Sequence, residues 1–245
     1  MKIKFFTNST HSDIQEIQSH CIKKHFPECE HHIIDGRVGW FLTWYKWLYD
    51  FKYETDIDYY IHVDEDCFIN SREEILNTID KMYREGYDIA GPPDGHHEYR
   101  SSNHMAINQF FMIVSKKCID VWHNRKNIPQ FKKEWIEPYQ FDIKNTSHYE
   151  YDMEWGSSGK PLGLIWKPDT EPYYDFMWVL KDNGIKFLYL EPVFGEELQT
   201  TNLLDNTIIH MWHQRERWVN GIVSTLHKMS NKSRFDEIIK IIKRN

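Results

Sequence analysis

The chain has few cysteines and no long run of apolar residues. Only four cysteines occur among 245 residues, and no two form a C-x-x-C pair. This excludes a disulfide framework and a paired-cysteine zinc site, and it predicts reduced thiols in a cytoplasmic protein. A membrane-spanning helix needs about 20 consecutive apolar residues, so we expect at most a peripheral association with the inner face of a membrane. The first residues do not resemble a secretion signal, and we expect none.

The chain also lacks an excess of basic residues. It has 30 Lys and Arg against 37 Asp and Glu, which gives a formal net charge of -7. Proteins that bind the phosphate backbone of nucleic acid need a basic face, so we expect no nucleic-acid partner. Hydrophobic residues make up 40% of the chain, and 16% of all residues are aromatic. A chain of this length and composition can bury a sizeable core in one compact unit, and most of the aromatic residues are expected inside it.

The first 95 residues predict alternating strands and helices. Strand-like segments lie at 2–8, 31–35, 58–63 and 87–93, and helix-like segments at 12–25, 40–51 and 72–85. This alternation predicts an α/β fold with a central, mostly parallel sheet and helices on both faces. In the second half we expect a strand and a short helix within 107–122, a helix at 173–184, a strand at 185–192 and a C-terminal helix at 233–245.

The stretch "DYYIHVDEDCFI" at 58–69 carries the clearest chemical signal. An apolar strand ends in Asp64, Glu65 and Asp66, and apolar residues follow at once. In open α/β sheets, ligands gather at the carboxyl ends of the strands. Alternate carboxylates at such an end suit a hard divalent cation, whose remaining ligands a diphosphate supplies. The alternative is a solvated acidic turn between strand and helix.

These residues resemble the D-x-D segment of the glycosyltransferases of the GT-A fold. Two further segments are similar to later parts of that family, "INQFFMIVSKK" and "YYDFMWVLKDNGIKFLYLEP". The resemblance implies a single GT-A-like domain over 1–245. Its Rossmann-like donor-nucleotide half would span 1–105 and merge with an acceptor half and C-terminal helix over 106–245. It also implies Mn²⁺ or Mg²⁺ as cofactor, a nucleotide-diphospho-sugar donor (UDP- or GDP-linked), and a glycan or glycolipid acceptor.

The resemblance also implies roles for individual residues. A late histidine often completes the family's metal shell, so the metal ligands would be Asp64, Asp66 and His210, with His213 as the second choice. The donor nucleotide and sugar would meet residues at the ends of the early strands and on the helix at 40–51. These residues are Thr7, Asn8, Asp35, Arg37, Lys46, Asp64 and Glu65.

The catalytic base is the point where this sequence departs from the family pattern. Aligned on Gly184, only Asp175 falls on an acid of the family's E-D-x-D, and Glu171 lies one residue from another. An inverting enzyme would use one of these two carboxylates to deprotonate the acceptor hydroxyl, with Asp152 and Glu154 in reserve. A retaining enzyme needs no such base. The competing interpretation of Asp175 is a first-turn helix acid stabilised by the dipole.

Two other classes of function use some of the same features. A sugar nucleotidyltransferase or another metal-dependent phosphate enzyme would also use paired acids and a metal. A sugar nucleotidyltransferase, however, usually has a glycine-rich loop after its first strand, where this chain has "TNSTHSD". A non-catalytic carbohydrate-binding module with a structural cation would explain the aromatic residues, although small modules of that kind are mostly all-β. The donor sugar, nucleobase, acceptor and stereochemistry are left open by the sequence.

Overall fold

The computed structural model describes residues 1–94, 105–135, 137, 139–140, 173–195, 200–211, 236–240 and 242. The helical elements are α1 (Ser12–His25), η1 (Gly36–Val38), α2 (Trp40–Asp50), α3 (Glu73–Glu85), α4 (Lys116–Asn124), η3 (Lys133–Trp135) and α6 (Tyr174–Asp182). The strands are β1 (Ile3–Ser9), β2 (Glu30–Asp35), β3 (Tyr59–Val63), β4 (Cys67–Ile69), β5 (Ile89–Gly91), β6 (Phe111–Ser115), β7 (Phe187–Tyr189), β8 (Val193–Gly195), β9 (Thr200–Leu203) and β10 (Ile208–Met211). Residues 236–240 and 242 are also helical.

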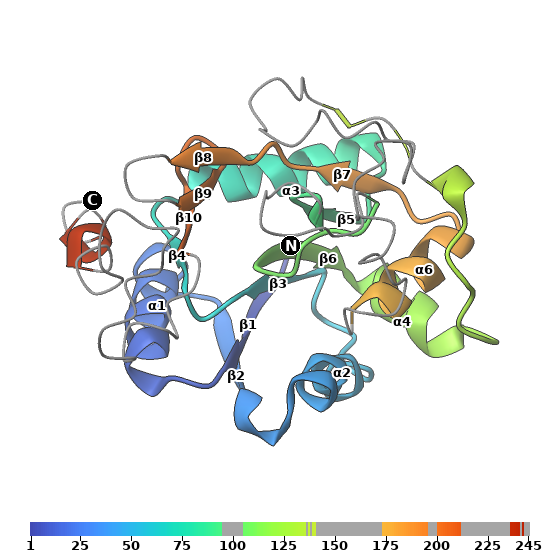
Figure 1. Cartoon of the computed structure of the whole chain (residues 1–245), viewed down its shortest axis with the longest axis horizontal. Helices are drawn as coiled ribbons and strands as arrows, with labels where there is room; N and C mark the ends of the chain where they lie inside the picture. Colours follow the sequence, from blue (N-terminus) through green and yellow to red (C-terminus); the bar gives the residue numbers. More distant parts are fainter. Residues whose placement is uncertain are drawn as a thin grey trace, which may run out of the picture.

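Six strands form the central sheet, in the order β2-β1-β3-β6-β5-β7 (Figure 1). Strands β2, β1 and β3 pair in parallel, and so do β5 and β7. Strand β6 is antiparallel to both of its neighbours, β3 and β5. Five of the six strands therefore point the same way, and their carboxyl ends meet at one edge of the sheet.

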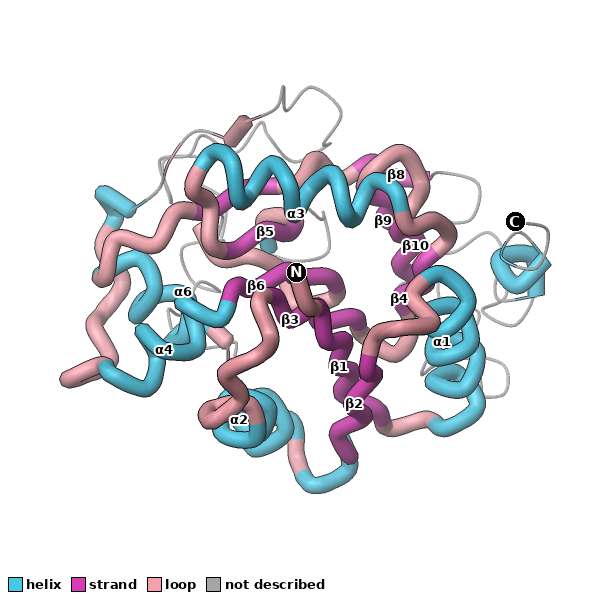
Figure 2. Tube along the Cα trace, turned by 180° about the vertical axis from the view of Figure 1, so that it is seen from behind, coloured by secondary structure: helices cyan, strands magenta, loops and turns pink. Residues whose placement is uncertain are grey.

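The two faces of this sheet carry separate hydrophobic cores, because successive side chains of a strand point to opposite faces. Phe6, Tyr60 and Met112 face one core together with buried residues of α2, α4 and α6. Phe5 and Ile61 face the other core together with buried residues of α1 and α3. Figures 1 and 2 show the same division, with α2, α4 and α6 on one side of the sheet and α1 and α3 on the other.

A second, smaller sheet lies beside α1 and has the antiparallel order β4-β10-β9-β8 (Figure 2). Phe68 of β4 and Ile209 of β10 pack with Ile14 of α1 and with Ile238 and Ile242. The C-terminal helical residues are thus anchored on the outside of α1 and the second sheet.

The α/β class with a central, mostly parallel sheet covered by helices on both faces is confirmed by this arrangement. The strand predicted at 58–63 is β3, whereas the strand β4 that follows the acidic turn was not predicted. Strand β3 belongs to the central sheet and β4 to the second sheet, with the turn at 64–66 between them.

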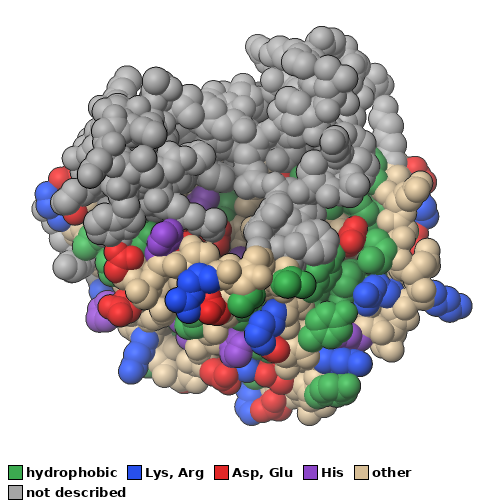
Figure 3. All heavy atoms as spheres, turned by 60° about the horizontal axis from the view of Figure 1, so that its bottom comes forward, with side chains coloured by type: hydrophobic (Ala, Val, Ile, Leu, Met, Phe, Trp, Pro, Cys, Tyr) green, Lys and Arg blue, Asp and Glu red, His purple; other side chains and the backbone are tan. Residues whose placement is uncertain are grey.

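Acidic and basic side chains are interspersed on the described part of the face seen in Figure 3, without a patch of one sign. No helix among the described residues is long and apolar enough to cross a membrane.

Candidate active site

The three carboxylates lie at the junction of the two sheets. Strand β3 is buried along its whole length and ends at Val63. The N–H of Cys67 then donates to the carbonyl of Asp64 at 3.0 Å, which closes a tight turn before β4. Cys67 is itself fully buried, and burial with the neighbouring Asp66 and Asp64 raises the pKa of its thiol well above the usual value. The turn is therefore held between two buried strands.

Strand β10 brings His210 to this turn. It pairs antiparallel with β4, so that His210 lies opposite Cys67. The N–H of Met211 donates to the carbonyl of Asp66 at 3.0 Å. His210 Nε2 lies 3.3 Å from Asp66 Oδ1, and both side chains are largely buried. The ligand atoms of Asp64, Asp66 and His210 all lie within 4.8 Å of one another.

Phe110 fixes the orientation of the imidazole. Its ring stacks on that of His210 at a centroid distance of 4.2 Å and an interplanar angle of 4°. The carbonyl of Phe110 also accepts a hydrogen bond from the N–H of Asp64 at 2.9 Å. One residue just before β6 therefore positions both the histidine and the first carboxylate.

The chemistry of this donor set fits a divalent cation such as Mn²⁺ or Mg²⁺. Two carboxylates and one neutral imidazole form a mixed oxygen and nitrogen set, which suits Mn²⁺ in particular. Ligands of an octahedral ion at about 2.1 Å lie about 3 Å apart when adjacent and about 4.2 Å apart when opposite. The separations between Asp64, Asp66 and His210 are close to this range, so one ion needs only a small adjustment of the side chains.

Glu65, the middle acid, has a different environment from its neighbours. It is 1% exposed, and its carboxylate accepts from Ser9 Oγ at 3.1 Å, Thr10 N at 2.7 Å, Thr10 Oγ1 at 2.8 Å and His11 N at 2.9 Å. These donors lie directly before α1, where a negative charge is stabilised by the helix dipole. Glu65 thereby ties the acidic turn to the loop between β1 and α1. The N-cap residue of α1 is His11, and its side chain makes no capping hydrogen bond.

A small pocket of about 60 Å³ opens beside Asp64 at the carboxyl ends of β1, β2 and β3. Its lining is Asn8, Thr10, Gly36, Thr43, Trp44, Asp64 and Gln109. Asn8 Oδ1 and Trp44 Nε1 are buried and have no hydrogen-bond partner among the residues that the structure describes. A buried acceptor and a buried donor without partners are costly. A polar ligand in this pocket, next to the metal-ligand cluster, would satisfy both.

Other residues expected at the donor site lie in different surroundings. Thr7 is fully buried, and its hydroxyl bonds to the carbonyl of Val63 at 2.8 Å and to His31 at 2.9 Å, so it supports the sheet. Asp35 and Arg37 are exposed and pair with each other through two side-chain bonds of 2.8 Å. Those bonds lower the pKa of Asp35 to about 2. Lys46 forms an exposed ion pair with Asp50, the residue four positions on in α2, at 2.6 Å.

Asp175 is the one candidate base within the described residues. It lies in the first turn of α6, as expected, and accepts a hydrogen bond from Tyr45 Oη of α2 at 3.0 Å. Burial and the nearby Asp175 carboxylate raise the pKa of Tyr45, so the phenol stays protonated and donates. Four other residues named from the sequence, Glu171, His213, Asp152 and Glu154, lie outside the described residues.

Sequence reasoning missed Asp94. This carboxylate is fully buried, three residues after β5, and accepts hydrogen bonds from Tyr174 Oη at 2.6 Å and from Asn108 Nδ2. Asn108 Oδ1 in turn accepts from the N–H of Phe110 at 3.0 Å. The network therefore reaches the residue that stacks on His210. The signal was present: like Asp64, Asp94 follows a strand at the edge of the sheet where carboxyl ends meet.

No protein-family model matches the sequence, and no curated protein matches it. Among solved structures, the chain is similar to a protein from STIV, with 13% identity and a TM-score of 0.48 over 86% of this chain and 94% of that one. It is similar to the galactosyltransferase LgtC, solved with donor and acceptor sugar analogs, with 10% identity and a TM-score of 0.47 over 100% and 96% of the two chains.

The chain is also similar to the mannosyltransferase PcManGT from Pyrobaculum calidifontis, which was solved with GDP-Man and Mn²⁺. The identity is 7% and the TM-score 0.37, over 52% of this chain and 47% of that one. Two of these three solved structures are glycosyltransferases.

Proposed function

We propose that this chain is a metal-dependent glycosyltransferase that moves a sugar from a nucleotide-diphospho-sugar, with UDP or GDP as the nucleotide, to a hydroxyl group of a glycan or glycolipid. The observation that carries the proposal is the cluster of Asp64, Asp66 and His210. Its ligand atoms lie within 4.8 Å of one another at a sheet edge, beside a pocket with unsatisfied polar groups. The sequence motifs that resemble the GT-A fold support the same class.

Each part of the site has a task in this reaction. Asp64, Asp66 and His210 would hold a Mn²⁺ or Mg²⁺ ion, which would supply positive charge against the donor diphosphate and the leaving nucleoside diphosphate. Asn8 and Trp44 offer one acceptor and one donor to the nucleoside part of the donor. Phe110 keeps the imidazole in place through its stacked ring. The residues thus orient the donor before the acceptor hydroxyl attacks the anomeric carbon.

Proton removal depends on the stereochemical course. If configuration is inverted, a carboxylate takes the proton of the acceptor hydroxyl. Asp175, held by Tyr45, and Glu171 are the proposed bases. If configuration is retained, an oxygen of the leaving phosphate takes the proton. In either case residues 1–105 supply the donor half of a single domain, and residues 106–245 supply the acceptor half.

A thermal-unfolding experiment tests the metal and the donor together. The chain is unfolded by heat in the presence of UDP, GDP, a UDP-sugar or a GDP-sugar, and each of these is tested with Mn²⁺ and with EDTA. A nucleotide at a hundredfold its Kd stabilises the folded state by about 2.7 kcal/mol. At about 2–4 °C per kcal/mol for a chain of this size, the expected rise in Tm is about 5–10 °C, and only with Mn²⁺. Asp66→Asn and His210→Gln should abolish it. Asp56→Asn, an exposed acid paired with Lys2, is the matched control.

The products then separate the candidate functions. A glycosyltransferase releases the nucleoside diphosphate from its donor, by transfer or by slow hydrolysis. A sugar nucleotidyltransferase instead forms a nucleoside triphosphate and a sugar 1-phosphate when pyrophosphate is added. If no nucleotide gives a Mn²⁺-dependent shift, the cluster is an ordinary His–Asp ion pair and the proposal fails.

A further inference from the structure

A second and larger cavity lies at the opposite edge of the central sheet from the metal-ligand cluster. It has a volume of about 560 Å³ and is lined by Tyr59 at the start of β3 and Ser115 at the end of β6. Tyr59 and Asp64 lie at opposite ends of β3 and are about 16 Å apart, because a strand rises about 3.3 Å per residue. The volume falls within the range of about 300–1,000 Å³ that is typical of small-molecule sites. The proposed transfer reaction does not use this cavity.

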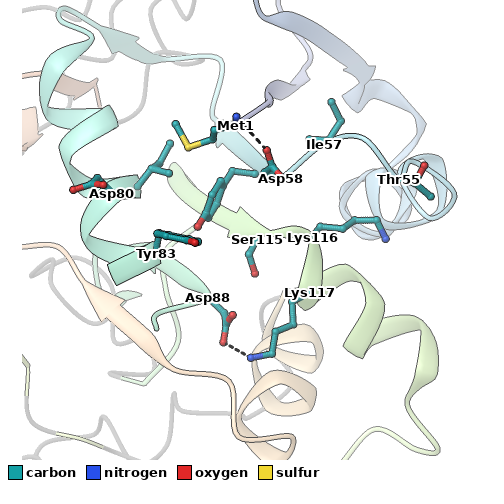
Figure 4. A pocket seen from close by; sticks show the side chains of 12 residues that line it. Met1, Thr55, Ile57, Asp58, Asp80, Tyr83, Asp88, Ser115, Lys116 and Lys117 are labelled. Atoms are coloured by element: carbon teal, nitrogen blue, oxygen red, sulfur yellow. Dashed lines mark hydrogen bonds and ion pairs between the residues drawn. The ribbon is translucent and has the colours of Figure 1, made fainter. Parts of the chain in front are cut away.

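One side of the cavity is an aromatic and apolar surface. Tyr83, from the last turns of α3, is 79% exposed, whereas Tyr59 and Ile79 beneath it are buried. Figure 4 shows Tyr83 on one side, Lys116 and Lys117 on the other, and Ser115 between them. Ile57, from the segment before β3, also contributes to the lining. An exposed tyrosine above a buried apolar floor offers a flat face for stacking.

Every charged side chain on the polar side of the cavity already has a charged or hydrogen-bonding partner. These side chains are Asp58, Asp80, Asp88, Lys116 and Lys117. Lys117 pairs with Asp88 at 2.9 Å, Asp80 with Arg84 at 2.8 Å, and Lys116 with Asp120, while Asp58 accepts the N–H of Lys2 at 2.6 Å. A strongly charged ligand would have to break these pairs. A neutral ligand with many hydroxyl groups can donate to the carboxylates and accept from the ammonium groups without breaking them.

We propose that this cavity binds a neutral pyranose sugar. The apolar face of the ring stacks on Tyr83. Its hydroxyl groups bond to Asp88, Ser115 and Lys117, which lie together across the opening (Figure 4). This site recognises a sugar unit remote from the position of transfer. Its binding of sugar does not depend on the metal-ligand cluster.

Methyl-resolved NMR of the full chain tests this site. The isoleucine δ1 methyl groups are ¹³C-labelled, and the chain is titrated with methyl α-D-glucopyranoside, methyl α-D-mannopyranoside and methyl β-D-galactopyranoside. At least one glycoside should shift the Ile57 and Ile79 signals in a saturable way. Tyr83→Ala should weaken that binding roughly tenfold, because the stacking and the apolar contact are lost together. Tyr83→Phe should retain it.

Matched controls make the outcome decisive. Tyr53 is 81% exposed and does not line the cavity, so Tyr53→Ala should leave the titration unchanged. Asp66→Asn should also leave it unchanged, which separates this test from that of the transferase. Spermidine and glucose 6-phosphate serve as cationic and anionic probes. The proposal is overturned if no glycoside gives a saturable shift, if only a charged probe does, or if Tyr83→Ala and Tyr53→Ala behave alike.

Discussion

Replacing Glu65 distinguishes a structural acid from a donor-binding one. Its Oε2 accepts from Ser9 Oγ, Thr10 N and His11 N, and its Oε1 accepts from Thr10 Oγ1. In Glu65→Gln, the amide oxygen can take the place of Oε2. The amide nitrogen then faces the Thr10 hydroxyl, which can rotate and accept. These four contacts survive, and the charge is lost.

The two substitutions Glu65→Gln and Glu65→Ala therefore differ in their expected cost in the free energy of unfolding. Glu65→Gln loses the charge assistance of the bonds and the interaction with the α1 dipole, a cost of about 1 kcal/mol in the free energy of unfolding. Glu65→Ala leaves buried donors without an acceptor, at about 1–3 kcal/mol for each donor that water does not reach. Because the two hydroxyls among the donors can turn elsewhere, we expect a total of about 3–5 kcal/mol for Glu65→Ala.

Urea denaturation measures the stability of each variant. A Mn²⁺ titration followed by electron paramagnetic resonance measures its metal binding. Glu16→Ala, an exposed acid on α1, is the control and should change the stability by no more than about 0.5 kcal/mol. Glu65→Gln should retain Mn²⁺ binding and donor binding. If instead Glu65→Gln unfolds like the parent chain but no longer binds the nucleotide-sugar, the carboxylate contacts the donor directly and the structural account is wrong.

Two further predictions concern the histidines. Burial lowers the pKa of His62 to about 4 from 6.5. Neutral His62 therefore contributes on the order of 3 kcal/mol to the free energy of unfolding. This contribution is fully present above the pKa of His62 in the unfolded chain, and it is lost as the pH falls through the pKa in the folded state. Urea midpoints measured across this window should fall with pH, and His62→Phe should flatten the slope; an unchanged slope would contradict the assignment. Phe110→Ala should weaken Mn²⁺ binding about 10–100-fold, as the loss of a ligand's supporting contact usually does, whereas Phe110→Tyr should retain it. Equal affinities of both variants in the Mn²⁺ titration would show that the ring does not position His210.

The sequence predicted the elements of the first half because local signals there are strong. The helices α1, α2 and α3 and the strands β1, β2 and β5 lie within a few residues of the predicted ranges. Gly86 and Gly184 end their helices in a left-handed conformation, with φ of 74° and 71°. Such positions favour glycine, which is why the helix ends were visible in the sequence. The alternation of elements was enough to predict the fold class.

Pairing between distant segments was not predictable in the same way. The antiparallel direction of β6 depends on contacts with β3 and β5, and no local pattern encodes it. The second sheet joins β4 to β10, about 140 residues apart in sequence. His210 was expected near the acids through a family resemblance, not from its own spacing. Asn8 was expected at the donor site and lines the pocket beside Asp64, whereas Lys46 pairs with Asp50.

The turn at 64–66 accommodates three adjacent carboxylates because it divides them between two different environments. Glu65 accepts hydrogen bonds from N–H groups of the loop between β1 of the central sheet and α1. Asp64 and Asp66 are left with His210, which the second sheet supplies. Bound to a divalent cation, these two acids lose their mutual repulsion as well. Since the ligands come from both sides of the junction between the sheets, the cation would also hold the two sheets together. In the proposed transferase, a cation that binds the donor diphosphate would therefore also make the site rigid.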